Sequence, residues 1–314
     1  MKLLRLLATS AVALGLLAVA APAMADNSPS IVGGTPATQA YPFAGSLQLD
    51  NHGDPNWGTC GVTLINPSFV ETNAHCVTNE PSFAPAARTA QRLYGNWLSA
   101  NADPAIDRTD PGIYHIRLGS NDRLNGGIVR HVKAITVHPG WDWGTPDAAG
   151  EVADIALLEL DKPVTSVKPA VIHPVNSTLI AREIGWGLTT EVPPSSPTNS
   201  EQFLRQIDVP VVDSSACADA GISAGELCLG GQGGGTCNGD SGSPALQLQG
   251  TGPAWSVIVG STSRAALDTC GSVGEPDVYT DLSYFQTWLI GVIYGEYTGA
   301  GSHVAPGKAL ASAE

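Results

Sequence analysis

The stretch Gly235-Thr236-Cys237-Asn238-Gly239-Asp240-Ser241-Gly242-Ser243-Pro244 places one serine, Ser241, between an aspartate and a glycine. Its glycine content is too high for a helix or a strand, so it predicts a sharp turn. Glycine reaches backbone angles that are closed to other residues and lets a substrate approach the main chain. Such a turn can present a serine nucleophile beside converging backbone N–H groups that form an oxyanion hole. A plain surface turn is the alternative, because Gly, Ser and Asp also cluster in ordinary turns.

Residues 1–25 have the pattern of a secretory signal peptide. A positively charged start precedes the apolar run Leu6 to Ala21, and Ala23-Met24-Ala25 offers a cleavage site. A membrane anchor is the alternative, but this run is rich in alanine and leads straight into the cleavage signal, whereas an anchor needs about 20 strongly apolar residues. We therefore expect a secreted, extracellular protein with a short propeptide over residues 26–30.

The six cysteines suit an exported chain, because disulfides form and persist in oxidising compartments. They predict three disulfides, and sequence alone does not select the pairing. A zinc site is the alternative, but the chain has no CxxC pair and no HExxH motif. The cysteines are Cys60, Cys76, Cys217, Cys228, Cys237 and Cys270.

The composition favours many turns and short strands over helix bundles, since the 314 residues include 36 glycines, 23 prolines and only 14% charged residues. The formal net charge of −14 argues against nucleic acid and anionic membranes as partners. Short apolar or alternating runs bounded by turn residues indicate an all-β sandwich or barrel. These runs are Gly45–Leu49, Gly61–Ile65, Ile113–Leu118, Val129–Val137, Ile155–Leu160, Phe203–Val212 and Ser256–Gly260.

Four motifs then occur in a characteristic order. They are Ile31-Val32-Gly33-Gly34, Thr72-Asn73-Ala74-His75-Cys76, Asp154-Ile155-Ala156-Leu157-Leu158 and Gly239-Asp240-Ser241-Gly242. With these motifs the chain resembles the chymotrypsin/trypsin family of serine endopeptidases from Ile31 to about Ile293.

The resemblance implies an all-β fold of two six-stranded antiparallel β-barrels with the active site in the cleft between them. Gly185-Trp186-Gly187 resembles the family's start of the second barrel. The apolar spacing of Ser283–Ile293 is helical and resembles the family's closing helix. We expect a peptidase domain over 31–297 and a flexible tail over 298–314.

A serine hydroxyl needs a base within hydrogen-bond reach to act as a nucleophile. Of the seven histidines only His75 lies in a motif, although the family usually has a small residue where Asn73 stands. Asp154 heads an apolar run, and an ionised carboxylate there needs a partner, for which the His75 ring N–H is suited. A turn aspartate before a strand is the alternative reading. The order His75, Asp154, Ser241 is that of the chymotrypsin family.

The resemblance implies that Gly239 and Ser241 supply the two N–H groups of the oxyanion hole. It implies that Asp240 pairs with a new α-amino group at Ile31 once an activating protease cleaves the precursor before that residue. The disulfides that it implies are Cys60–Cys76, Cys217–Cys228 and Cys237–Cys270.

No cofactor or metal is expected. The segment Ser120-Asn121-Asp122-Arg123 stands at the family's calcium loop but lacks acidic residues in the places that bind. Asn176-Ser177-Thr178 is a formal glycosylation acceptor.

The resemblance also bears on substrate specificity. Gly235 lies six residues before Ser241, where trypsin-like members carry an aspartate, whereas Asp277 replaces a glycine of the facing wall. In this alignment the acidic residue of the specificity pocket stands on the opposite wall, as Asp277. We therefore expect cleavage after Arg or Lys, with broad secondary activity. An Asp277 turned toward solvent is the alternative, and Arg264 could neutralise it. Ser263 and Ala265 match the other wall.

Two stretches fit the family poorly. Val77 to Gly112 is a long insertion with Leu93-Tyr94 and Trp97-Leu98 as possible anchors, either a flap beside the leaving-group side of the cleft or a plain surface insertion. Glu191–Ser200 is a Pro/Ser/Thr linker, expected without regular structure.

The sequence thus predicts a secreted, monomeric serine endopeptidase that is made as a precursor and acts on proteins or peptides. A catalytically silent protease-like binding domain is the alternative from another class, although such proteins usually lose a triad residue. An esterase would share the same chemistry.

Overall fold

A computed structural model describes residues 31–81, 94, 103, 105–190, 200–248, 255–266 and 271–296. The predicted signal peptide, propeptide and tail, residues 191–199 of the linker, Cys270 and most of the insertion before Gly112 lie outside the described residues. No helix in the described ranges is long and apolar enough to cross a membrane.

The first half of the chain forms a closed antiparallel barrel with the strand order β2-β3-β4-β7-β6-β5. Side chains alternate along its strands: in β5, Tyr114, Ile116 and Leu118 point into the core and the residues between them do not. The strands are β2 (Ala44–Asn51), β3 (Asp54–Asn66), β4 (Phe69–Thr72), β5 (Tyr114–Leu118), β6 (Ile128–Val137) and β7 (Ala156–Leu160).

The second half closes in the same way, since β9 pairs with both β10 and β12 at the ends of the order β10-β11-β14-β13-β12. Its strands are β9 (Ile180–Gly185), β10 (Arg205–Val212), β11 (Glu226–Gln232), β12 (Pro244–Gln247), β13 (Val257–Ala265) and β14 (Val273–Asp281). Two short strands are added outside this ring: β1 (Thr35–Pro36) pairs with β10, and β8 (Val171–Ile172) pairs in parallel with β13.

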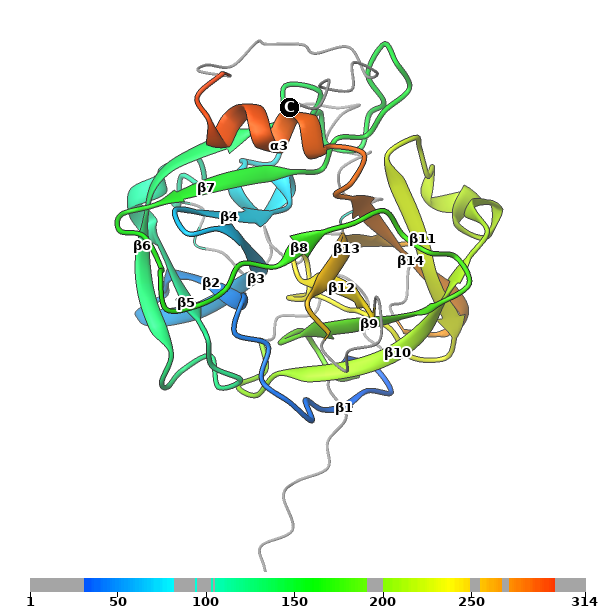
Figure 1. Ribbon diagram of the computed structural model, residues 1–314, viewed down its shortest axis with the longest axis horizontal. Coiled ribbons are helices and arrows are strands. Elements are labelled where there is room, and N and C mark those ends of the chain that lie inside the picture. The colour runs from blue at the N-terminus through cyan, green and yellow to red at the C-terminus, as the bar shows by residue number, and fades with distance from the viewer. Residues whose placement is uncertain are drawn as a thin grey trace, which may run out of the picture.

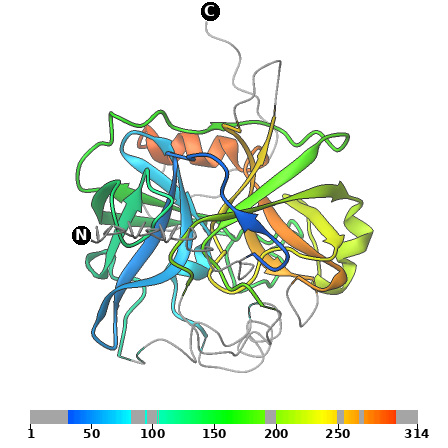
Figure 2. The same cartoon turned by 90° about the horizontal axis from the view of Figure 1, so that it is seen from below.

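The two barrels lie side by side (Figure 1), and the view at right angles shows β1 alongside the second barrel rather than the first (Figure 2). The helix α3 (Gln286–Ile293) follows the second barrel in sequence but packs its Trp288, Leu289 and Val292 into the core of the first. The expectation of two six-stranded antiparallel barrels with a C-terminal helix is confirmed. The described residues also form three short 3₁₀ helices: η1 (Ala74–Val77), η2 (Pro111–Ile113) and η3 (Ser214–Ala220).

The turn that carries Ser241 rests on a strand of the first barrel. The Gly61 N–H in β3 donates to the Ser241 carbonyl over 2.6 Å. Added Cβ atoms at Gly61 and Gly242 would collide with Ser243 and with the Gly61 carbonyl, respectively, so both positions require glycine for this close approach. Gly61 follows Cys60, whose disulfide leads to Cys76, and so the turn is brought to the segment that holds His75.

Candidate active site

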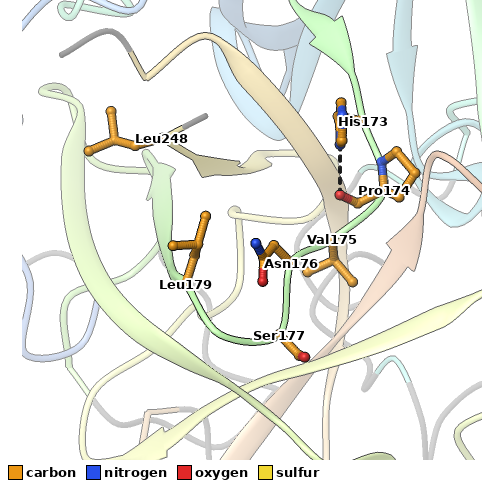
Figure 3. Close-up of a pocket in the computed structure, with 7 residues that line it drawn as sticks. All are labelled: His173, Pro174, Val175, Asn176, Ser177, Leu179 and Leu248. Atoms are coloured by element: carbon orange, nitrogen blue, oxygen red, sulfur yellow. Dashed lines mark hydrogen bonds between the residues drawn. The ribbon is translucent and has the colours of Figure 1, made fainter. Parts of the chain in front are cut away.

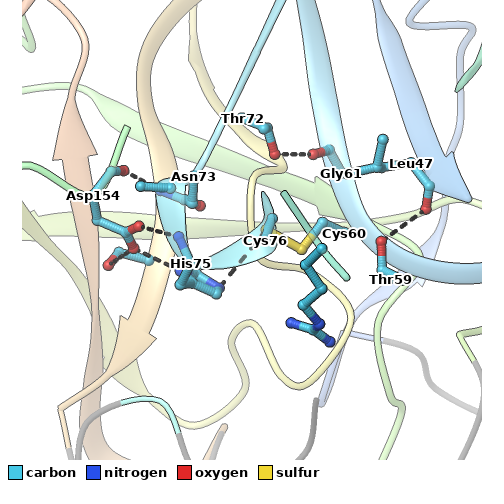
Figure 4. Close-up of a disulfide and its surroundings, with 12 residues drawn as sticks. Leu47, Thr59, Cys60, Gly61, Thr72, Asn73, His75, Cys76 and Asp154 are labelled. Atoms are coloured by element: carbon cyan, nitrogen blue, oxygen red, sulfur yellow. Dashed lines mark hydrogen bonds and ion pairs between the residues drawn. A yellow bond between two sulfur atoms is a disulfide. The ribbon is translucent and has the colours of Figure 1, made fainter. Parts of the chain in front are cut away.

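His75 lies in η1 directly after β4 and before the disulfide-bonded Cys76. The Cys60–Cys76 disulfide ties this short helix to β3, as Figure 4 shows. The His75 side chain is only 3% exposed. A histidine on one short, cross-linked turn has little freedom to change its orientation.

Asp154 is fully buried just before β7 and accepts three hydrogen bonds. The His75 backbone N–H donates to Oδ1 at 3.0 Å, and His75 Nδ1 and the Ser263 hydroxyl donate to Oδ2, each at 2.7 Å (Figure 4 shows the two His75 bonds). These donors compensate the desolvation of a buried carboxylate. Because Nδ1 carries the proton toward Asp154, Nε2 is left to accept one.

The main chain of Asp154 is fixed as well. The Asn73 side-chain amide donates to its carbonyl at 2.7 Å and the Thr280 hydroxyl at 2.9 Å. Thr280 belongs to β14 of the second barrel, so Asp154 is held from both barrels. This explains why a polar Asn73 stands where a small residue was expected.

Ser241 is partly exposed at the tip of the glycine-rich turn. Gly239 has a φ of +95° and faces Ser200, where a Cβ would lie 2.8 Å from the serine hydroxyl oxygen. Among the described residues, the N–H groups of Gly239 and Ser241 have no acceptor. In this conformation no hydrogen bond joins the Ser241 hydroxyl to His75, whose Nε2 lies 3.8 Å from Cys76 Sγ.

Asp240 points away from Ser241 into the second barrel, where it is fully buried. Its carboxylate accepts from the N–H groups of Gly187 at 2.7 Å and Cys237 at 3.0 Å. Burial raises the pKa of Asp240 to about 7. Ile31 is also fully buried. Its neighbour Val32 forms an isolated β-bridge with Gly235, in which the Gly235 N–H donates to the Val32 carbonyl at 3.0 Å.

Asp277 lies beside Gly235 and is 2% exposed, so its carboxylate does not face solvent. Thr236 donates to Asp277 Oδ2 from its N–H at 2.7 Å and from its hydroxyl at 2.8 Å. A Cβ at Gly235 would lie 2.6 Å from the same oxygen. Burial raises the pKa of Asp277 to about 7, although the two bonds from Thr236 lower it. The Asp277 carboxylate therefore occupies the space that a side chain at position 235 would need.

Comparison with protein families matches residues 31–289 to Trypsin. The chain belongs to the trypsin family. It is 30% identical to Serine protease 7 of Drosophila melanogaster over 265 residues, which are 78% of this chain and 60% of that relative. It is 28% identical to CLIP domain-containing serine protease B4 of Anopheles gambiae, over 84% of this chain and 70% of that relative. It is also 28% identical to Phenoloxidase-activating factor 1 of Holotrichia diomphalia, over 81% and 67%.

The trypsin-family disulfides are present where both partners are described: Cys60–Cys76 and Cys217–Cys228. Cys237 is also disulfide-bonded, and its expected partner Cys270 lies outside the described residues. In the described part of the chain the only clustered metal-ligand types are Cys60, His75 and Cys76, whose two sulfurs form a disulfide.

Arg264 does not neutralise Asp277, which corrects one of the expected alternatives. Its guanidinium is turned into the protein, where it forms a fully buried ion pair with Glu226 and donates to the Ala220 carbonyl at 3.2 Å. The neighbouring Ser263 side chain is occupied by Asp154. Ala265 is partly buried and packs against the cluster of Val32, Leu188 and Cys237.

Sequence reasoning missed two buried acids behind these positions. Glu183 in β9 is fully buried without a hydrogen bond to its carboxylate oxygens, and burial and the nearby Asp277 raise its pKa. Glu71 in β4 is in the same condition, and burial raises its pKa to about 8. Each has a buried apolar neighbour in its strand, Val70 in β4 and Ile184 in β9, which was the available signal.

It also missed an aromatic group beside His75. The ring of Tyr94 lies 4.9 Å from the His75 ring, and Trp141 and Trp143 lie within 5.8 Å of Tyr94. The Trp-Asp-Trp sequence at 141–143 was the signal, while Tyr94 had been singled out only as an anchor of the insertion.

A separate cavity of about 570 Å³ is lined by the loop His173–Leu179 and by Leu248 (Figure 3). The exposed Asn176 of the glycosylation sequence lines it, and its side-chain oxygen accepts from the Thr178 hydroxyl at 2.7 Å. None of the residues predicted to carry chemistry lines this cavity.

Proposed function

We propose that this protein is a secreted serine endopeptidase that hydrolyses peptide bonds through an acyl-enzyme on Ser241. Its substrates are proteins or peptides, and it acts as a monomer. The observation that carries the proposal is the His75–Asp154 pair, placed by one disulfide beside the strand on which the Ser241 turn rests. Its trypsin-family relatives are named as serine proteases, which supports the same activity.

In the proposed reaction, His75 Nε2 takes the proton of the Ser241 hydroxyl as its oxygen attacks the substrate carbonyl. The developing oxyanion is received by the N–H groups of Gly239 and Ser241, which have no acceptor among the described residues. Asp154 stabilises the imidazolium. His75 then returns the proton to the leaving amine, and water hydrolyses the acyl-enzyme by the reverse sequence.

The proposal includes synthesis as a precursor. Cleavage before Ile31 by another protease would create an α-ammonium group that pairs with Asp240, and this pairing would order the turn at Gly239 and Ser241. Ser30 precedes the cleavage point, so an activator of trypsin-like specificity is not expected.

The proposed preference is for Arg or Lys at the cleaved residue, with broad secondary activity. The buried Asp277 carboxylate beside the side-chain-free Gly235 supports it, because such a group in a partly dry pocket attracts a guanidinium or ammonium.

A catalytically silent binding domain is the second candidate. The observation that favours it is the small exposure of the His75 side chain, 3%, since a catalytic base must reach its substrate.

Labelling with a fluorophosphonate separates the two candidates. The proposal expects stoichiometric labelling of the activated protein at Ser241, none in Ser241→Ala, and hydrolysis of peptide bonds as well as of simple esters, whereas an esterase would hydrolyse the esters alone. A folded, activated protein that neither labels nor cleaves would establish the silent domain instead. Recovery of the processed protein from culture medium tests secretion.

A further inference from the structure

Thr63 and Glu71 are polar side chains on the outer face of the first barrel, yet neither reaches solvent. Val62 and Leu64, the neighbours of Thr63 in β3, belong to the apolar core of this barrel, and so does Val70 beside Glu71 in β4. Because side chains alternate along a strand, Thr63 and Glu71 point out of that core. They stand opposite each other in the β3–β4 register, and both are 0% exposed.

The second barrel meets this pair with further polar groups. β3 lies beside β12 of that barrel (Figure 1). Burial raises the pKa of Glu71 to about 8, and the nearby hydroxyl of Ser261 in β13 lowers it in part. Ser261 is in register with Thr280 of β14, whose hydroxyl accepts a hydrogen bond of 3.3 Å from the Asn73 amide. Asn73 follows Glu71 by two residues, so these contacts lead back to the end of β4.

This group contains more acceptors than donors to satisfy them. In the described part of the chain, five of its oxygen atoms have no hydrogen-bond partner: Thr63 Oγ1, both carboxyl oxygens of Glu71, Asn73 Oδ1 and Ser261 Oγ. All four side chains are 0% exposed, so bulk solvent does not serve them. A buried polar atom without a partner costs folding free energy, and five together at one interface point to an occupant that satisfies them.

The chemistry of these atoms limits what the occupant can be. One carboxylate, one amide carbonyl and two hydroxyls make an all-oxygen set, which suits hard cations rather than transition metals. Asp154, the other acid that acts on Glu71, is already bonded to His75 and Ser263. A divalent cation would thus leave one positive charge uncompensated in a buried place, whereas Glu71 alone balances a monovalent one.

We propose that this group is a binding site for an alkali-metal cation, sodium or potassium, between the two barrels. Its ligands are the side-chain oxygens of Thr63, Glu71, Asn73 and Ser261. The cation takes the place of the Glu71 proton, which passes to solvent, and it joins β3 and β4 to β13. The site goes beyond the proposed peptidase function and does not depend on it, because neither His75 nor Ser241 is a ligand.

The test follows urea unfolding of the full chain carrying Ser241→Ala, which prevents self-digestion. Sodium or potassium chloride is compared with choline chloride at the same concentration and pH 9. A cation that binds only the folded protein, present at ten times its Kd, should lower the unfolding equilibrium constant about tenfold relative to choline. At pH 6 Glu71 keeps its proton, so the apparent affinity for the cation should be about a hundredfold weaker than at pH 9.

Three further substitutions in this background locate the effect. Glu71→Gln keeps the size of the side chain but removes its charge, and it should abolish the difference between alkali salts and choline. Ser261→Ala removes one neutral oxygen and should weaken the cation effect while keeping its pH dependence. Glu183→Gln is the matched control, because Glu183 is also a 0% exposed acid without a hydrogen bond but lies in β9. The cation effect should remain in that variant.

Equal stabilisation by choline, or an alkali effect that persists in Glu71→Gln, would overturn the proposal and leave water or the proton as the partner of these oxygens. A larger effect of calcium chloride than of sodium chloride at equal ionic strength would contradict a monovalent site. If Glu71→Gln does not fold, the pH comparison decides, since an ion effect of equal size at pH 6 and pH 9 excludes Glu71 as a ligand. None of these measurements uses activity, so a failure of the peptidase function leaves them unaffected.

Discussion

The two barrels share one topology but differ in what they bury. The large apolar cluster is built mainly from the first barrel and α3, whereas the cluster inside the second barrel has six buried members. The second barrel buries the carboxyl groups of Glu183, Asp240 and Asp277 beside this smaller cluster, while the first barrel buries those of Glu71 and Asp154. A hydrocarbon core contributes stability at every pH, while buried carboxyl groups cost folding free energy and titrate.

This difference corresponds to different tasks. The first barrel supplies His75 and Asp154, whose mutual geometry has to be fixed, and a packed apolar interior fixes it. The second barrel supplies the groups that are proposed to receive charge: Asp240 for the new amine and Asp277 for a basic substrate. In the second barrel, the free-energy cost of burying Asp240 and Asp277 would thus be offset when each binds its proposed cation.

The largest expected effect tests whether the barrels act as one unit. Ser241→Ala removes the proposed nucleophile in the second barrel and His75→Ala removes the proposed base in the first, and each should lower kcat by about 10⁴-fold or more. The double variant should be little worse than either single one, because the two groups act together. Steady-state kinetics measure this, with circular dichroism to establish folding. Substantial peptidase activity in Ser241→Ala would refute the triad assignment.

The next effect concerns the second barrel alone. Asp240→Asn should leave precursor cleavage intact but remove the partner of the Ile31 amine, and losing one member of a buried pair costs about 3–5 kcal/mol. That is a loss of roughly 10² to 10³ in kcat/KM or more. N-terminal sequencing identifies the active form, and full activity of a protein that begins at Asp26 would contradict the idea. Asp208→Asn, at a surface ion pair with Arg182, is a control for losing an acid in the same barrel.

Substrate selectivity provides a smaller effect in the same barrel. Asp277→Gly should lower the ratio of kcat/KM for Arg over Phe peptides by about tenfold, since hydrogen bonds to charged groups are worth about 1.5–3 kcal/mol. In wild type the ratio should rise as pH increases through about 7, because Asp277 ionises there and only the ionised form attracts the cation. An unchanged ratio in Asp277→Gly would leave a chymotrypsin- or elastase-like preference as the better assignment.

The smallest effect concerns Glu71, a fully buried acid of the first barrel. Burial raises its pKa to about 8 from a model-compound value of 4.5, so the folded state keeps a proton that the unfolded state loses. Its contribution to the free energy of unfolding therefore falls by about 1.4 kcal/mol per pH unit as pH rises between these values. Glu71→Gln should flatten that part of the stability profile in urea titrations. Glu296→Gln, at an exposed acid, should not, and equal slopes in all three proteins would argue against a protonated Glu71.

Much of the fold was predictable because its signals are local. The runs that became β2, β5, β6 and β7 lie within a few residues of their predicted bounds. That the strands close into two barrels could be predicted only from the family resemblance, because pairings such as those of β9 with β10 and β12 join segments that are distant in the sequence.

The candidate site divides in the same way. His75, Asp154 and Ser241 each stand in a short motif, so sequence could single them out. The inward turn of Arg264 depends on Glu226, 38 residues away, and the contact of Tyr94 with His75 joins residues 19 positions apart. Neither leaves a periodic or compositional signal, because both arise from packing between segments.

The hydrogen bond between Gly61 and Ser241 has a practical meaning for how the molecule can be divided. This hydrogen bond joins the two closed barrels, and the proposed base lies on the first barrel while the proposed nucleophile lies on the second. Neither barrel alone carries all three of His75, Asp154 and Ser241. Separating the barrels would therefore separate the proposed base from the proposed nucleophile, a division that a split-enzyme reporter of protein association requires.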